Sequence, residues 1–313
     1  MFSKAFILRY HNQMIGTLFI LAACLLWGMD TLIRYPLVER GLNPITIVFY
    51  EHLVLSLIFS TTLIPAIKRI GNLRLSDVLG FIIVGGVGSA LATVCFTESF
   101  KYLNPSLVIL LQKFQPVVAI FLSAIVLKEK IQKPFLFWSA ICLVGGTLVS
   151  SPDLINFWNL IMNGNGIASS DGAIHGYLLV MISVIGWGAA TVFGKHLSSG
   201  GFDTKAIMGG RFLTGLVVLI PFIHFNQSII LNEVTDYSKI LLMVFISGGC
   251  AMWFYYKGLK LIPARSAAIS EMFFPLFAII LNWIFLGKEL NQWQLVGGGL
   301  LILGSLIIQL KRY

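Results

Sequence analysis

Six ionisable residues lie inside the long apolar segments of this 313-residue chain. They carry both signs of charge: Asp30, Glu51, Glu98, Lys113, Arg211 and Glu271. A charged group in lipid is costly, so such residues pair with one another or line a polar cavity that binds ions, protons or solutes. The sequence has no Walker sequence for nucleotide hydrolysis and no GxSxG nucleophile elbow. These residues therefore predict binding chemistry rather than enzymatic chemistry, and they give no sign of ATP-driven pumping.

Two acidic residues have a basic partner close by in the sequence. Asp30 precedes Arg34 by four residues, and Glu98 precedes Lys101 by three. Residues at these spacings lie side by side on a helix. We expect both to form local ion pairs near the outer ends of their helices.

Glu51 and Arg211 occupy equivalent positions in a repeat of 160 residues, yet their charges are opposite. The same spacing relates Trp27-Gly28 to Trp187-Gly188, Thr31 to Thr191 and Gly41 to Gly201, and a spacing of 159 relates Pro116 to Pro275. A rise of about 1.5 Å per residue, counted from the ends of their apolar segments, places the Glu51 and Arg211 backbones about 8 Å apart along the membrane normal. Two interpretations remain open: a structural ion pair between the two halves, or a gate or substrate contact.

The fourth apolar segment of each half carries a polar residue four positions before a proline. Gln112 precedes Pro116 and Glu271 precedes Pro275, and Lys113 adjoins Gln112. Proline frees the backbone carbonyl four residues earlier and kinks the helix. Each kink should therefore place a polar side chain beside an unpaired backbone oxygen, which must face protein or water. We expect Gln112, Lys113 and Glu271 to contact a substrate, although a kinked helix without a ligand role is the alternative.

Aromatic residues and one histidine complete the candidate site. Tyr50, Trp27, Trp187 and Trp253 are able to stack on a ligand, or else they mark the membrane interface. His52 adjoins Glu51, so Glu51, Glu271 and His52 are the candidates for proton coupling. No residues have metal-ligand spacing, and we expect neither a metal nor a cofactor.

Composition identifies lipid as the main solvent of the chain. Hydrophobic residues make up 57% of the sequence and charged residues 11%, with a mean hydropathy of +0.88. Soluble domains usually contain about a quarter charged residues. The formal charge of +9 would suggest nucleic acid as a partner for a soluble protein, but here basic cytoplasmic loops explain it better.

Ten apolar segments have about the length needed to cross a bilayer. They cover residues 14–33, 44–65, 77–98, 104–126, 134–151, 175–196, 203–224, 238–259, 265–286 and 292–310. We predict an all-α integral membrane protein with a five-helix repeat over 1–151, a connecting loop over 152–174 and a second repeat over 175–313. Because five is odd, the two repeats would have opposite orientations in the membrane.

The basic residues favour one orientation. Of the 22 lysines and arginines, 15 fall on one side of the ten segments and five on the other. Positive residues concentrate on the cytoplasmic side, so both termini should be cytoplasmic.

This organisation resembles the EamA branch of the drug/metabolite transporter superfamily. The resemblance rests on the two inverted five-helix copies, the Trp-Gly pairs, the prolines of the fourth helices, and the Leu-Lys-Glu and Leu-Gly-Lys-Glu stretches that end at Glu129 and Glu289. It covers nearly the whole chain. It implies a central cavity lined by the first four helices of each copy, with the fifth helices peripheral, and transport of small organic solutes.

Taken together, these features predict a secondary transporter of the bacterial inner membrane that works by alternating access. Buried charges of both signs favour amino acids or related zwitterions, and we expect export. Importers or exchangers of amines or carboxylates with the same fold are the alternative. A membrane protein without transport activity, or an enzyme that modifies lipids, fits the sequence less well.

Overall fold

The computed structural model describes residues 4–61, 74–126, 128, 131–162, 172–226, 231, 233–262, 270–271 and 273–311. All regular elements in these residues are helical. Helices suit lipid because each backbone polar group finds its partner within the same segment. The predicted all-α class is therefore confirmed for the described part of the chain.

The helices follow one another in two series. The first series is α1 (Lys4–Glu39), α2 (Pro44–Ile58), α4 (Leu75–Phe81), η2 (Ile82–Leu91), α5 (Ala92–Ser99), α6 (Pro105–Leu111), η3 (Gln112–Phe114), α7 (Gln115–Val126) and α8 (Lys133–Met162). The second is α9 (Ala173–Ser199), α10 (Thr204–Asn226), α11 (Val234–Met243), η5 (Val244–Cys250), α12 (Ala251–Leu261), α14 (Phe273–Leu286) and α15 (Gln292–Lys311). Within each series, some consecutive elements form one continuous helix. These are α4, η2 and α5 in the first series and α11, η5 and α12 in the second.

Seven described helices are long and apolar enough to cross a membrane. Three shorter apolar helices occupy other predicted segments: Pro44–Ile58, Phe273–Leu286 and Gln292–Ile308. The end of the predicted segment 44–65 and the beginning of 265–286 lie outside the described residues. Ten crossings therefore remain a proposal, because α2 and α14 as described are shorter than the usual span of about 20 residues.

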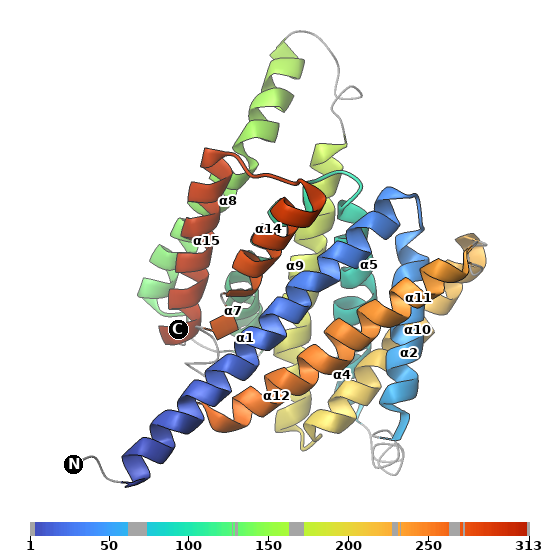
Figure 1. Ribbon diagram of the computed structural model, residues 1–313, viewed down its shortest axis with the longest axis vertical. Helices are drawn as coiled ribbons and strands as arrows, with labels where there is room; N and C mark the ends of the chain where they lie inside the picture. The colour runs from blue at the N-terminus through green and yellow to red at the C-terminus, as the bar shows by residue number, and fades with distance from the viewer. Residues whose placement is uncertain are drawn as a thin grey trace.

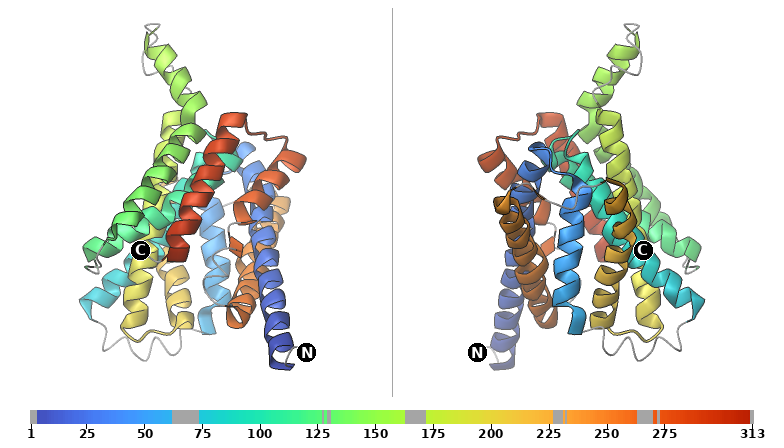
Figure 2. Two further views of the ribbon diagram at one scale, coloured as in Figure 1. Left: turned by 90° about the vertical axis from the view of Figure 1, so that its left-hand side faces the viewer. Right: turned by 90° about the vertical axis from the view of Figure 1, so that its right-hand side faces the viewer.

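The prediction that the fifth segment ends at 151 is wrong. Helix α8 passes through Pro152 and continues to Met162. Proline has no N–H for the carbonyl four residues earlier, which here is Leu148. The Ser151 hydroxyl donates to that carbonyl oxygen at 2.8 Å, so the helix continues without an unpaired acceptor. Figure 2 shows the end of α8 projecting beyond the rest of the bundle.

Equivalent helices of the two series run in opposite directions. In Figure 1, α1 rises from the N-terminus at the lower end, whereas α9 begins at the upper end and descends. We propose on this basis that the two halves are inverted repeats, as the odd number of predicted segments requires.

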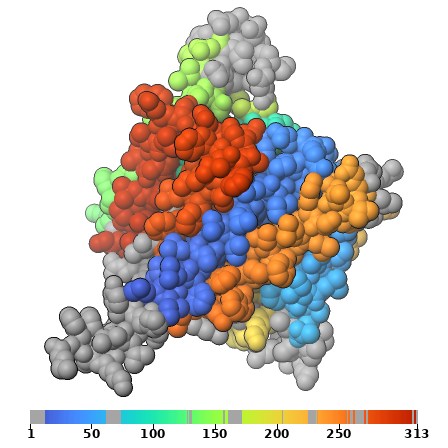
Figure 3. Space-filling view, in the orientation of Figure 1, coloured from blue at the N-terminus to red at the C-terminus, as the bar shows by residue number. Residues whose placement is uncertain are grey.

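The first helix of each half packs against the other half. Helix α1 contacts α11, η5, α12 and α14, and α9 contacts α4, η2, α5 and α7. Figure 3 shows α1 lying on one face between α12 and α14. This exchange makes each half dependent on the other for its packing.

Glycines of the two Trp-Gly pairs allow the first helix of each half to pack closely against the other half. A Cβ on Gly28 would lie 3.2 Å from the backbone nitrogen of Ala278, and one on Gly188 would lie 3.3 Å from that of Ala119. Ala119 and Ala278 are themselves 159 positions apart. Small residues allow helices in lipid to approach closely. The repeated sequence thus specifies the same backbone contact twice.

Helices α8 and α15 pack against each other at Gly145 and Gly297. Neither contributes to the central cavity described below. The fifth helices are therefore peripheral, as the family resemblance implied.

In each half, the continuous helix α4–η2–α5 or α11–η5–α12 contains a π-helical segment rich in small residues. These segments are η2 and η5, and π-helices are rare enough in proteins to mark functional regions. A Cβ on Gly85 of η2 would collide with the Thr214 hydroxyl and the Arg211 carbonyl of α10. The Thr214 hydroxyl also donates to the Phe81 carbonyl at 3.0 Å, so this contact leaves no room for a side chain.

We predict that Gly85→Val lowers the free energy of unfolding by about 1–3 kcal/mol, since overpacking a close contact forces the backbones apart. Thermal unfolding of purified protein in detergent would measure the loss. Gly299→Val is the matched control, because nothing lies within 4 Å of its Cβ position. Equal melting temperatures for the two variants would contradict the close packing of η2 on α10.

We also predict that the two termini lie on the same side of the membrane. Single cysteines introduced after Met1 and before Tyr313, in a background lacking the four native cysteines, should both react only with a membrane-permeant maleimide in intact cells. Reaction of one terminus with an impermeant reagent would contradict the arrangement with ten crossings.

Candidate functional site

A cavity of about 480 Å³ lies between the two halves. It is lined by residues of the first four helices of each half and by none from α8 or α15. The polar and aromatic lining residues are Trp27, Asp30, Thr31, Arg34, Glu51, His52, Ser89, Thr93, Phe96, Gln112, Gln115, Trp187, Thr191, Arg211, Phe212, Ser247 and Phe274. The cavity therefore lies where the repeated units meet.

Equivalent residues of the two repeats line this cavity together. Trp27 and Trp187 both line it, as do Thr31 and Thr191. Glu51 and Arg211 form a further equivalent pair, with opposite charges. The backbone repeats, but the chemistry of the cavity wall does not.

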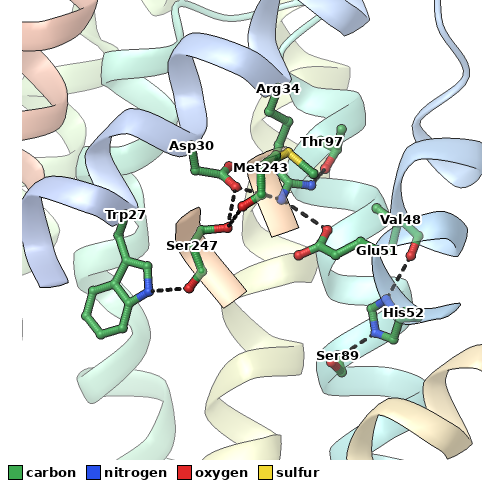
Figure 4. A network of polar contacts seen from close by, with 10 residues as sticks. All are labelled: Trp27, Asp30, Arg34, Val48, Glu51, His52, Ser89, Thr97, Met243 and Ser247. Atoms are coloured by element: carbon green, nitrogen blue, oxygen red, sulfur yellow. Dashed lines mark hydrogen bonds and ion pairs between the residues drawn. The ribbon is translucent and has the colours of Figure 1, made fainter. Parts of the chain in front are cut away.

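The cavity wall is organised by Arg34, whose side chain is only 4% exposed. Its Nε donates to Asp30 Oδ2 at 2.7 Å, and its Nη2 donates to Asp30 Oδ1 at 3.1 Å and to Glu51 Oε2 at 3.0 Å. Its Nη1 donates to the Thr97 hydroxyl at 3.2 Å. One guanidinium thus holds two carboxylates and joins α1 to α2 and α5 (Figure 4). Such multiple charge-assisted bonds suit the planar geometry of arginine.

The same network reaches the second half through Ser247 of η5. The Ser247 hydroxyl shares its one proton between Asp30 Oδ1 at 2.9 Å and the Met243 carbonyl at 2.8 Å, and Trp27 Nε1 donates to the Ser247 carbonyl at 3.2 Å (Figure 4). Both contacts come from one face of α1, since Trp27, Asp30, Thr31 and Arg34 follow helical spacing. Helix α1 is therefore fixed to the π-helical segment of the opposite repeat.

A second polar chain involves His52, Ser89 and Arg211. His52 Nδ1 lies 2.9 Å from the Val48 carbonyl, which only accepts, so Nδ1 carries the proton. Nε2 of the neutral ring then accepts from the Ser89 hydroxyl at 3.0 Å. The Ser89 oxygen in turn accepts from Arg211 Nε at 3.0 Å. This chain joins α2 and η2 of the first half to α10 of the second.

The α-helical geometry breaks before Pro116, where η3 spans Gln112–Phe114. The prediction of an unpaired Gln112 carbonyl is wrong, because the Gln115 N–H donates to it. A tightened 3₁₀ turn thus satisfies the carbonyl that proline leaves without a partner. The turn nevertheless directs two amide side chains to the cavity, Gln112 and Gln115.

Six of the predicted site residues line the cavity: Trp27, Glu51, His52, Gln112, Trp187 and Arg211. Four others do not.

The four predicted residues outside the cavity lining are Tyr50, Trp253, Lys113 and Glu271. Tyr50 packs edge-on to Tyr237, with ring centroids 5.3 Å apart. The Trp253 side chain is 53% exposed, and Lys257 Nζ lies 3.9 Å from its ring centroid.

Glu271 and Lys113 lie beside Phe274 rather than in the cavity lining. Glu271 accepts from the Tyr255 hydroxyl at 2.8 Å, and Lys113 Nζ lies 5.5 Å from the centroid of the Phe274 ring. Trp27 contacts both Tyr255 and Phe274, with ring centroids 5.3 and 6.5 Å apart. Trp27 therefore links this cluster to Ser247 and the Arg34 network.

Both predicted local ion pairs are confirmed. Glu98 and Lys101 form a half-exposed pair at 2.8 Å. Asp30 and Arg34 also pair, but α1 continues beyond them to Glu39, so they do not lie at the end of the helix as predicted, and both line the cavity. Among the described residues, Glu51 forms its ion pair with Arg34 rather than with Arg211.

The sequence feature that could have identified Arg34 as a cavity residue is the helix face on which it lies. Trp27, Asp30 and Thr31 lie on the same face, and the spacing of 160 residues relates Trp27 to Trp187 and Thr31 to Thr191. Ser89 and Ser247 carried no comparable signal, since each lies in a stretch of small residues that is typical of helix packing. No group of three or more potential metal ligands occurs among the described residues.

Comparison with known proteins gives one family. The model of the EamA-like transporter family matches residues 14–151 and 174–310. The riboflavin transporter ImpX of Fusobacterium nucleatum is 28% identical over 95% of this chain and 98% of its own length. An uncharacterised transporter of Archaeoglobus fulgidus is 24% identical over 91% of this chain and 95% of its own. The uncharacterised transporter YetK of Bacillus subtilis is 24% identical over 83% of this chain and 76% of its own.

A solved crystal structure superposes on the chain with a TM-score of 0.56. The superposition covers 94% of this chain and 95% of the other, at 16% sequence identity. At this identity the likeness concerns the fold.

We predict that Arg34→Met destabilises the protein by about 3 kcal/mol, because it leaves two largely buried carboxylates without their cation. Thermal unfolding in detergent would measure the loss. Lys101→Met is the control, since it breaks only a half-exposed pair of small energetic value. Combining Arg34→Met with Asp30→Asn and Glu51→Gln should recover much of the stability. A melting temperature for Arg34→Met equal to that of the parent would contradict this network.

Proposed function

Because the chain belongs to the EamA-like transporter family, we propose that it carries an uncharged, planar aromatic solute across the membrane, with riboflavin as the first candidate. The observation that carries this proposal is the central cavity, which is lined by aromatic side chains and hydrogen-bonding groups and in which Arg34 pairs with Asp30 and Glu51.

The size and walls of the cavity support a solute larger than an amino acid. A volume of about 480 Å³ falls within the range of roughly 300–1,000 Å³ typical of sites for drug-sized ligands. Trp27 and Phe274 lie on one part of the wall, with Phe96 and Trp187 in ring contact on another. Aromatic faces bind planar rings by stacking. A flat heterocycle fits such a lining better than an aliphatic side chain.

The charges of the lining support an uncharged solute. Asp30 and Glu51 balance Arg34 and Arg211, so the formal charge of these four groups is zero. Arg34 is almost fully engaged with the two carboxylates. A solute with a full charge would upset this balance in a region of low dielectric constant, where an unpaired charge is costly.

The relative ImpX supplies the specific candidate, since it is described as a riboflavin transporter and aligns with nearly the whole chain. Riboflavin has a planar tricyclic ring, a polyol chain and no net charge at neutral pH. These three properties match the aromatic walls, the amides and hydroxyls, and the balanced charges of the cavity.

Zwitterionic amino acids, predicted from the sequence, are the second candidate. What favours them is that Glu51 and Arg211 both line the cavity with opposite charge. What disfavours them is that Arg34 already neutralises one oxygen of Glu51. For either candidate we propose export by alternating access in a bacterial inner membrane. We also propose proton coupling through Glu51, His52 or Glu271.

We predict that purified protein in proteoliposomes mediates saturable uptake of radiolabelled riboflavin but not of glutamine, a zwitterion of similar polarity. Trp187→Ala should weaken riboflavin binding by roughly tenfold or more because it removes a stacking surface. Trp283→Ala is the control, since that side chain is 58% exposed and outside the cavity lining. Glutamine flux without riboflavin flux would contradict the first candidate and favour the second.

The same vesicles test the coupling. An imposed pH gradient should change the steady-state riboflavin gradient if a carboxylate such as Glu51 carries a proton during transport. Flux that ignores the pH gradient would refute proton coupling and leave facilitated transport in place.

A further inference from the structure

One carboxylate oxygen in the cavity wall has no hydrogen-bond partner among the described residues. Glu51 uses Oε2 to accept from Arg34, and no donor reaches its Oε1. The Glu51 side chain is 15% exposed and lines the cavity. In Figure 4 its second oxygen carries no dashed line and lies on the side of Glu51 that faces Ser247. A partly buried carboxylate oxygen without a partner is an acceptor available to a ligand.

Arg34 fixes the direction of this acceptor. Its guanidinium is held by both oxygens of Asp30, so its position does not depend on Glu51 alone. By holding Oε2, Arg34 orients the Glu51 carboxylate and leaves Oε1 toward the cavity. The site is thus organised before a solute binds, which reduces the entropic cost of binding.

Asp30 does not offer the same acceptor. Its Oδ2 accepts from Arg34 Nε, and its Oδ1 accepts from Arg34 Nη2 and from the Ser247 hydroxyl, which shares its proton with the Met243 carbonyl. Of the two cavity carboxylates, Glu51 is therefore the one with an oxygen left for a ligand.

Neutral polar groups of the lining complement this acceptor. The Gln112 amide and the Thr93 hydroxyl form no side-chain hydrogen bond with any residue that the structure describes, and both line the cavity. An amide both donates and accepts, so it can meet ring carbonyls as well as ring nitrogens. The cavity thus combines one carboxylate acceptor with adaptable neutral groups and aromatic faces.

We propose that Glu51 is the specificity-determining residue of the cavity and that its free oxygen accepts the imide N–H of a planar heteroaromatic ring. In riboflavin this group is the N3–H, which lies between two ring carbonyls. An inference of this kind rests on the proposed function. An imide N–H is more acidic than the ribityl hydroxyls, and hydrogen bonds from such donors to a carboxylate are strong. Rings of the same shape without an N–H at this edge would be rejected.

Arg34 also determines what Glu51→Gln should do. Since a guanidinium only donates, the glutamine must turn its carbonyl oxygen toward Arg34. Its NH2 group then faces the cavity in place of an acceptor. The N–H of the ligand would meet a second donor, and the selectivity of the site for an imide would be lost although the change in size is negligible.

The first experiment compares two ligands on the unmodified full-length protein in detergent. Riboflavin and 3-methylriboflavin differ only at the imide nitrogen, and quenching of flavin or tryptophan fluorescence reports binding of each. We expect 3-methylriboflavin to bind roughly 10- to 100-fold more weakly, as the loss of a hydrogen bond to a charged group implies. This comparison does not depend on whether any variant folds.

The second experiment repeats the comparison on Glu51→Gln. We expect its affinity for riboflavin to fall by roughly 10- to 100-fold and its preference for riboflavin over 3-methylriboflavin to disappear. Glu98→Gln is the matched control, because Glu98 pairs with Lys101 away from the cavity lining and should retain both affinity and preference. Size-exclusion profiles and melting temperatures confirm that the variants are folded.

The outcomes separate the two proposals. Equal affinity of the unmodified protein for the two flavins would overturn the role of Glu51 and leave riboflavin transport standing. A preference for riboflavin that survives in Glu51→Gln would overturn it as well, since the methyl group would then be excluded by shape alone. Absence of riboflavin binding by the unmodified protein would overturn the proposed function and this inference together.

Discussion

The structure depends on one arginine enclosed between two carboxylates inside an apolar bundle. Arg34 is 4% exposed and bonds to Asp30, Glu51 and Thr97. A guanidinium in such a place is tolerated only when it is paired and fully hydrogen-bonded. Satisfying it fixes α1, α2 and α5 relative to one another, and the Asp30–Ser247 bond extends the constraint to the second half. The cavity inherits its shape and its free acceptor from this requirement.

Duplication explains how a symmetric frame carries an asymmetric site. Gly28 and Gly188 place the first helix of each half against the fourth helix of the other in the same way. The positions equivalent to Asp30 and Arg34 are Ala190 and Gly194, so the second half has no counterpart of the ion network. The backbone arrangement is thus specified twice, whereas the charges that organise the cavity are specified once. A solute without symmetry of its own is recognised by such a wall.

The sequence was sufficient to predict the helical class, the family and much of the cavity. Trp27, Trp187, Glu51 and Arg211 were identifiable because the repeat relates them, and a repeat places equivalent residues about one axis. The partner of Glu51 was not predictable in the same way. Spacing of four residues explained the Asp30–Arg34 pair locally, and nothing in the sequence indicated that Arg34 also reaches α2.

Other failures of prediction have local physical causes. Pro152 is a strong stop signal for a helix, but a single serine hydroxyl removes the penalty by binding the carbonyl that proline leaves open. Pro116 frees a carbonyl only if the preceding turn stays α-helical, and here it tightens to a 3₁₀ turn. Lys113 and Glu271 are absent from the cavity lining, whereas Trp27 and Phe274, which contact the same cluster, are part of it. Which of two neighbouring side chains faces a cavity depends on helix rotation, and rotation depends on tertiary packing.

The central claim is that the cavity beside the Arg34 network is the solute site. A cryo-EM structure of the full-length protein with saturating riboflavin tests it most directly. We expect planar density in contact with Trp27 or Trp187, with its imide edge within hydrogen-bonding distance of Glu51 Oε1 and the Arg34–Asp30–Glu51 bonds intact. Riboflavin density elsewhere in the bundle, or a cavity that stays empty while the ligand is bound, would contradict it.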